Sequence, residues 1–289
     1  MPSRASQATR AIGAAFAAVL AFLADPESAG AQTDAQALPT VRPSIAIEPQ
    51  NGAAELAYEI FFGGARIGVL DGRATVDERG YELTFRFRTD GVLAWAVEGR
   101  SVARAIGMVS ADGGFTPRLY ETSGTWNGSH RSVALEFGAA GQIERISTKQ
   151  DKPEERDAVP EDKRVGLDPI TLLMSVARNP QTDGTWQERA TFDGRRVVTY
   201  RWRCGERSEL KPTSTSTFAG EAVLCIVSGR QTAGFHRSAR RIFDFDKPGR
   251  LWLAPVRGLG VHMPVRLVMD TEWGGLMVYA TRTGRAPDM

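Results

Sequence analysis

Histidine is the first residue type to test for chemistry, because its neutral ring can bind a metal ion or act as a general base near neutral pH. The chain holds three, His130, His236 and His262, and no two of them have the spacing of metal ligands. The sequence contains neither the H-E-x-x-H pattern of zinc hydrolases nor the G-x-S-x-G pattern of a serine nucleophile. Each histidine is near an expected turn or strand end, so we expect solvated histidines rather than catalytic ones.

Two further patterns resemble parts of sites. Asp244 and Asp246 stand two residues apart, so on a strand they would share one face, as a pair of catalytic carboxylates requires. They precede the turn sequence at residues 247–249, which favours a solvated strand end instead. The glycines at 258 and 260 lack the third glycine and the helix of a dinucleotide-binding loop. We therefore predict no catalytic centre, no metal site and no cofactor.

The two cysteines predict a disulfide. Cys204 and Cys225 each lie in a run of alternating polarity, and a hairpin around Lys211–Thr217 would place their thiols nearly opposite each other. A disulfide suits an oxidising compartment. Two buried free thiols are the alternative.

The amino terminus indicates export. Arg4 and Arg10 are followed by an apolar run from Ala11 to Ala24 and by Ala29-Gly30-Ala31, the small-residue pattern that signal peptidase requires. The apolar run is shorter than the roughly 20 helical residues that cross a bilayer. We predict a signal peptide over residues 1–31, the general secretory route and a periplasmic protein without a stable membrane span. Residues 32–52 hold three prolines and too little periodicity for a core, which predicts a disordered tether.

Charge argues against nucleic acid as a partner. The chain has 36 lysines and arginines against 34 acids, a formal net charge of +2. The predicted signal peptide holds two arginines and two acids, so its removal leaves that balance unchanged. A nucleic-acid-binding protein normally shows a basic face or stripe. The charged segment from Lys149 to Arg164 mixes both signs with two prolines, and it predicts a solvated loop.

One helix is expected, and the rest of the chain must position it. Asp168 can cap this helix, Pro169 fits its first turn, and Asn179-Pro180 ends it. Apolar residues form one stripe and extend round to a second face, so we expect the helix to be covered on both: Ile170, Leu172, Leu173, Met174, Val176 and Ala177.

The other elements read as short strands. The residues from Tyr81 to Arg88 alternate strictly between apolar and polar, and Asn127-Gly128 is a strong hairpin turn. Turn signals recur every 8 to 12 residues, which is typical of an antiparallel sheet that curls into a barrel or sandwich. We predict a mainly β protein: a curled antiparallel sheet or open barrel with the helix on its concave face. Residues 53–282 would form a single domain of two β halves, joined by the loop and helix of residues 149–179, and residues 283–289 a flexible tail.

Aromatic residues are concentrated on one face of these strands. A sheet this wide can curve around a space that one helix does not fill, which would leave an apolar cavity for an acyl chain or a hydrophobic segment. The alternative is that the same residues simply fill a core. The cavity hypothesis names Tyr58, Phe62, Tyr81, Phe85, Phe87, Leu173, Met174, Tyr200 and Trp202.

Several short motifs, in their order along the chain, resemble an exported Gram-negative bacterial family known as the domain of unknown function number 3108. They are the Tyr58 strand with Gly63-Gly64, Tyr81 after its turn, Leu167-Asp168-Pro169, Asp193-Gly194-Arg195-Arg196 and Ala233-Gly234-Phe235. The resemblance covers about residues 53 to 282 and brings no activity with it. At the level of fold this family is similar to half-barrel carriers that move lipoproteins across the periplasm, which implies a curved antiparallel sheet with helical cover.

The expected function is therefore non-catalytic. We expect a periplasmic protein of the cell envelope that binds a hydrophobic ligand, either a lipid or a lipidated protein. A scaffold that recruits envelope proteins through an exposed sheet edge or the 149–164 loop is the alternative. A hydrolase is the second alternative, and it would require a cleft that joins a histidine to a carboxylate.

Overall fold

A single antiparallel sheet of 13 strands forms the described part of the chain in a computed structural model, which describes residues 53–178, 180, 182–237, 248–256, 259, 261–271 and 274–285. The strand order is β7-β6-β5-β4-β3-β2-β1-β13-β12-β11-β10-β9-β8. The first half contains β1 (Ala53–Phe62), β2 (Ala65–Val76), β3 (Tyr81–Thr89), β4 (Gly99–Val109), β5 (Phe115–Trp126), β6 (Ser129–Phe137) and β7 (Ile143–Gln150). The second half contains β8 (Gln187–Phe192), β9 (Val197–Leu210), β10 (Gly220–Ala233), β11 (Gly249–Val256), β12 (Val261–Thr271) and β13 (Gly274–Arg285).

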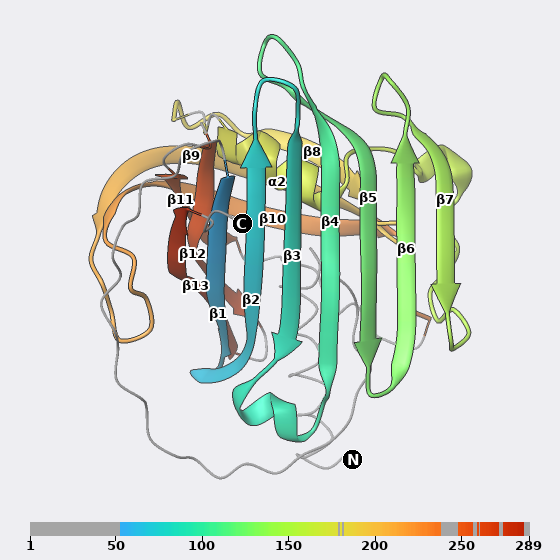
Figure 1. The fold of residues 1–289 in the computed structure, drawn as a ribbon, viewed down its shortest axis with the longest axis horizontal. Helices are drawn as coiled ribbons and strands as arrows, with labels where there is room; N and C mark the ends of the chain where they lie inside the picture. Colours follow the sequence, from blue (N-terminus) through green and yellow to red (C-terminus); the bar gives the residue numbers. More distant parts are fainter. Residues whose placement is uncertain are drawn as a thin grey trace.

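The first strand of the sheet pairs with its last. β1 lies between β2 and β13, so each half of the chain is a meander that extends outward from this central junction. Figure 1 shows β1–β7 upright in front and the long strands β9 and β10 running across behind them. No ladder between described residues joins the outer strands β7 and β8. The predicted curled antiparallel sheet is confirmed, in its open form rather than as a closed barrel.

Helix α2 (Pro169–Arg178) lies inside this curl. It contacts β4 and β5 of the first half and β8 and β12 of the second, which confirms the predicted position on the concave side. Two short 3₁₀ helices complete the elements, η1 (Gly91–Trp95) between β3 and β4, and η2 (Glu161–Lys163) in the connector before α2.

The two apolar faces of α2 are covered separately. Ile170 and Met174 belong to the main core, which takes side chains from both halves of the sheet. Leu172, Val176 and Ala177 pack on the other side, against a smaller cluster around the cysteines. Leu173, which we placed in the covered stripe, is only partly buried. A helix between two sheet layers buries most of its circumference, and this explains why its apolar surface is so wide.

The predicted disulfide is confirmed. Cys204 on β9 and Cys225 on β10 are direct partners in the ladder and are bonded to each other. Both cysteines are buried against α2, beside Leu172 and Val176. The bridge therefore ties together the two strands on which the second face of the helix rests.

The connector between the halves is less exposed than expected. Residues 149–164 were predicted to be a solvated loop, but Arg156 and Val159 are buried, and Arg156 bridges to His236 in the second half. Strand β7 also takes in Lys149 and Gln150. At the other end, β13 continues to Arg285, three residues beyond the predicted end of the domain.

Several sequence predictions lie outside the described residues. They are the signal peptide and tether over residues 1–52, the Asp244 and Asp246 pair, and the glycines at 258 and 260. Among the described residues, no helix is long and apolar enough to cross a membrane.

Candidate functional site

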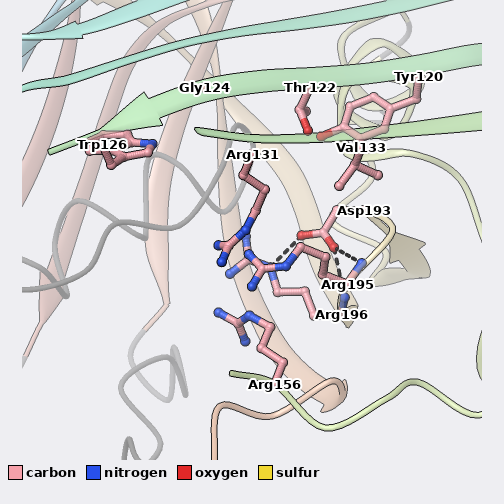
Figure 2. Close-up of a pocket in the computed structure, with 10 residues that line it drawn as sticks. All are labelled: Tyr120, Thr122, Gly124, Trp126, Arg131, Val133, Arg156, Asp193, Arg195 and Arg196. Atoms are coloured by element: carbon pink, nitrogen blue, oxygen red, sulfur yellow. Dashed lines mark hydrogen bonds and ion pairs between the residues drawn. The ribbon is translucent and has the colours of Figure 1, made fainter. Parts of the chain in front are cut away.

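A pocket opens on the inner face of β5 and β6. Its cavity volume is about 30 Å3, and the pocket opens to solvent. Figure 2 shows the Arg131 side chain near those of Arg195, Arg196 and Arg156. The lining residues are Tyr120, Thr122, Gly124, Trp126, Arg131, Val133, Arg156, Asp193, Arg195 and Arg196.

Strand periodicity produces the apolar wall. Tyr120, Thr122, Gly124 and Trp126 fall at every second position of β5, so all four face the interior. The Trp126 ring stacks on Phe87, with 5.8 Å between ring centroids. Glycine at 124 fits closely against β4, because a Cβ there would lie 3.0 Å from the Cβ of Ser101.

The opposite wall is the turn between β8 and β9, residues 193–196. The Asp193 carboxylate accepts hydrogen bonds from the backbone N–H groups of Arg195 and Arg196, both at 2.9 Å, which fixes the turn. Gly194 has a φ of 92°, and a Cβ at this position would lie 2.2 Å from Cγ1 of Val133. Only glycine lets the turn of the second half approach β6 of the first half so closely.

Each arginine of the pocket is held by a neighbouring acceptor. Arg195 donates two hydrogen bonds to the Glu154 carboxylate, at 2.7 and 3.0 Å. Arg196 Nε donates to Asp193 at 2.6 Å, and Arg156 donates to the carbonyl oxygen of Gly234 at 2.9 Å. Arg131 Nε donates to the Gln150 side chain at 3.2 Å.

Charged side chains pair along one wall of the pocket. Burial opposes ionisation of Glu154, but the Arg195 guanidinium outweighs it and lowers the pKa of this carboxyl to about 2. Among the described residues, the pocket wall holds four arginines and Asp193, and Glu154 pairs with Arg195. The facing wall of Tyr120, Trp126 and Val133 offers apolar contact.

A buried polar network lies at the start of α2. Asp168 is fully buried and accepts hydrogen bonds from the backbone N–H groups of Ile170 and Thr171, so it is the predicted helix cap. The Thr171 hydroxyl lies 2.5 Å from both the Asp168 carboxylate and the Tyr81 hydroxyl. Burial raises the pKa of Asp168 to about 6 and that of the Tyr120 hydroxyl well above its ordinary value. The network of Asp168, Thr171 and Tyr81 positions the helix and does not line the pocket.

The three histidines do not form a cluster. The His236 ring is 2.7 Å from the Glu155 carboxylate, His130 is exposed, and burial lowers the pKa of His262. Within the described parts of the chain, no three histidine, cysteine or acidic side chains are placed to hold a metal ion.

A comparison with protein families covers most of the chain. A family model described as a protein of unknown function, DUF3108, matches residues 57–281. The chain belongs to the DUF3108 family. No curated protein matches this DUF3108 chain.

One solved structure shares the fold, and two others have lower structural similarity. The DUF3108 chain is similar to a beta-barrel-like protein from Brucella abortus, of the domain of unknown function DUF1849, with a TM-score of 0.50 and 12% identity over 84% of this chain and 100% of that one. A candidate lipoprotein from Parabacteroides distasonis gives a TM-score of 0.31 with 8% identity, over 84% of this chain and 100% of that one. A candidate exported protein with a YmcC-like fold from Bacteroides fragilis gives 0.32 with 10% identity, over 83% and 99%.

The nine residues named for an apolar cavity lie elsewhere in this DUF3108 fold. Six of them are buried in the main core: Tyr58, Phe62, Tyr81, Phe85, Phe87 and Met174. Tyr200 and Trp202 pack on the smaller cluster beside the disulfide, and Leu173 is partly exposed. None of the nine lines the pocket, and Phe87 reaches it only through its contact with Trp126.

Sequence reasoning missed the arginines of the DUF3108 pocket. Arg195 and Arg196 were noted only as part of a family motif, and Arg156 was assigned to a solvated loop. The Asp-Gly-Arg-Arg turn was the signal that could have identified them. Aspartate and glycine are sufficient to form a tight turn. The two arginines that follow are not needed for the turn and could therefore have suggested a second role.

Proposed function

We propose that this DUF3108 protein is a non-catalytic protein of the periplasm that binds a lipid or a lipidated partner in the pocket beside β5 and β6. The observation that carries the proposal is the two-sided lining, apolar at Tyr120, Trp126 and Val133 and basic at the 193–196 turn. A ligand with an apolar chain and a polar head matches such a lining. The amino-terminal export pattern and the disulfide support a periplasmic location.

Mass spectrometry of the protein purified from the periplasm tests this proposal. We expect a lipid to co-purify with the wild type. Thr122→Trp fills the pocket from β5 and should remove the lipid, whereas Thr125→Trp, three residues along the same strand and on its other face, should keep it. Wild-type protein without lipid, or equal lipid content in both variants, would count against the proposal.

The outer strand β7 favours a second candidate, a scaffold for envelope proteins. Among the described strands, β7 pairs only with β6, and its side chains are largely exposed. An edge strand of this kind can add a strand from a partner. Cross-linking from Thr148 in cells separates the two functions: a scaffold gives defined protein adducts there, and a lipid-binding protein gives none.

A further inference from the structure

The 3₁₀ helix η1 presents apolar side chains to solvent at the end of the β3–β4 hairpin. Trp95 is 91% exposed, more than any other large apolar side chain among the described residues, and Val92 is 49% exposed. Side chains three residues apart lie over one another in a 3₁₀ helix, so these two share one face. Figure 1 shows η1 projecting beyond the ends of β3 and β4. Single exposed apolar residues are ordinary on a protein surface, but a projecting apolar tip is not.

This apolar tip, Val92 and Trp95, stands on a fixed base. The backbone N–H of Gly91 donates to the Asp90 carboxylate at 2.7 Å, and the Asp90 N–H donates to the carbonyl oxygen of Ile67 on β2 at 3.1 Å. On the other side of η1, Val97 is buried in the main core. The exposure of the tip is therefore built into the fold.

Two arginines stand behind the apolar tip. Arg88 near the end of β3 and Arg100 at the start of β4 are ladder partners, and both are exposed. An arginine in such a place can put its guanidinium among lipid head groups while its methylene chain stays with the apolar layer. Acids are close as well: Asp90 lies 3.9 Å from the Arg88 guanidinium, and Glu98 is exposed. We therefore expect apolar contact, more than charge, to supply the affinity.

A lipid bilayer fits this tip better than a protein surface does. A stable protein interface takes about 800 Å2 from each partner. The apolar tip consists of two side chains on one turn of helix, with charged residues around it. A bilayer needs no matching groove, because lipids rearrange around an inserted side chain, and tryptophan is enriched at the level of the head groups.

The apolar tip lies at the same end of the sheet as one end of the pocket. Gly99, the first residue of β4 after η1, is the ladder partner of Trp126. The Trp126 ring lines the pocket and stacks on Phe87. Contact between the tip and a bilayer would bring this end of the pocket toward the lipid head groups.

We propose that η1 docks this protein onto the surface of a lipid bilayer, with Val92 and Trp95 inserted among the head groups. The inference goes beyond the proposed function, because a pocket can hold a ligand with or without membrane contact. Two side chains bury too little apolar surface for a permanent anchor, so the docking is reversible.

Co-sedimentation with vesicles tests the docking. The purified protein, with its disulfide intact, is mixed with vesicles of phosphatidylethanolamine and phosphatidylglycerol. We expect the wild type to sediment with the vesicles and Trp95→Ser to bind about tenfold more weakly. The matched control is Met108→Ser, at the opposite end of β4, where the apolar side chain is 46% exposed. This control should bind like the wild type.

Fluorescence quenching by lipids with brominated acyl chains shows which side chain inserts. Trp95→Phe keeps an apolar ring and removes the fluorophore, so it should still bind vesicles and lose most of the quenching. Trp186→Phe is the control. The Trp186 ring is 43% exposed and has the guanidinium groups of Arg201 and Arg203 over it, so quenching should persist without it.

Three results would overturn the docking: wild-type protein that does not bind vesicles, equal weakening by Trp95→Ser and Met108→Ser, or full quenching in Trp95→Phe. A photoreactive amino acid at position 95 that labels a protein in cells, with no lipid adduct, would assign the tip to a protein partner instead.

The docking and the proposed function can fail separately. Vesicle binding through Trp95 by a protein that carries no co-purified lipid would uphold the docking and overturn the proposed function. Co-purified lipid in a protein that does not bind vesicles would overturn the docking and leave the proposed function intact.

Discussion

Asp168 has two opposing roles at the start of α2. Its carboxylate caps the helix, where a negative charge is favourable, yet its complete burial favours the neutral acid. Burial prevails, and the pKa is raised to about 6. A helix that plugs the sheet is thus anchored by a group that changes charge within the physiological pH range.

This raised pKa predicts a pH-dependent stability. Because the native pKa lies above the ordinary value of 3.8, the contribution of Asp168 is fully present below that value and is lost as pH rises through 6. The loss is about 3 kcal/mol in the free energy of unfolding. Urea unfolding at several pH values from 4 to 7.5 measures it, with Asp168→Asn as the control, since asparagine also caps helices. If both proteins show the same pH slope, Asp168 is not the titrating group.

Substitutions of the neighbouring residues Leu173 and Met174 should differ sharply in their effect on the free energy of unfolding. Met174 is 0% exposed in the main core, whereas Leu173 is partly exposed. Met174→Ala should lower the free energy of unfolding by about 3 kcal/mol, and Leu173→Ala by about 1 kcal/mol or less. Chemical denaturation of both variants measures this, and equal losses would contradict the arrangement of the helix between two layers.

Sequence periodicity predicted which aromatic residues are buried, because alternation fixes the face of each side chain. It did not predict whether the buried side enclosed a cavity, since packing depends on the distance between two halves far apart in the chain. The buried arginines were missed for a related reason. Arg156 sits in a segment whose mixed charge indicates solvent, and tertiary partners such as Gly234 and His236 explain its burial.

At the scale of elements, the β9–β10 hairpin forms the support for the second face of α2. Its disulfide closes a loop with a sequence separation of 21 residues. In the chain-entropy model, a loop of this length stabilises the native state by about 3 kcal/mol.

Cys204→Ala with Cys225→Ala should therefore lower the free energy of unfolding by about 3 kcal/mol, with some further loss from the two buried sulfur atoms. Urea unfolding of the double variant and of the wild type checks this. The wild type treated with a reductant should lose a similar amount. If neither the double variant nor the reduced wild type lost stability, the disulfide would not restrict the conformations of the unfolded chain.

The alternation of polar and apolar residues, together with turn residues, predicted where strands occur. The Asn127-Gly128 hairpin is an example, and both of its turn residues have a positive φ. Strand ends were less predictable. β9 continues past Cys204 to Leu210, because the charged residues there lie on the exposed face of a paired strand. The sequence shows those charges but not the partner strand that accommodates them.

At the scale of the whole molecule, the turn at 193–196 joins the two halves of the open sheet. Gly194 touches Val133 of β6, and Gly234 approaches the same turn from the end of β10, where a Cβ would lie 2.1 Å from the Arg195 carbonyl oxygen. The pocket exists only because these distant segments meet. That dependence on tertiary contact explains why the sheet was predictable from sequence and the site was not.

Gly194→Ala tests this contact against a matched control. Gly194 and Gly184 both have a positive φ, but a Cβ at Gly184 would meet no atom within 4 Å. Gly184→Ala should cost about 1 kcal/mol in the free energy of unfolding, from backbone strain alone. Gly194→Ala should cost about 2 kcal/mol more, because its methyl group overlaps Val133. Thermal and urea unfolding measure both, and equal costs would contradict the close approach of the two halves.

Photo-cross-linking in cells tests the central claim most directly. A photoreactive amino acid replaces either Thr122, inside the pocket, or Thr125, on the opposite face of β5. After irradiation, the purified protein is analysed by mass spectrometry. We expect a lipid adduct from position 122 and none from position 125. Equal labelling at both positions, or no lipid adduct at position 122, would contradict it.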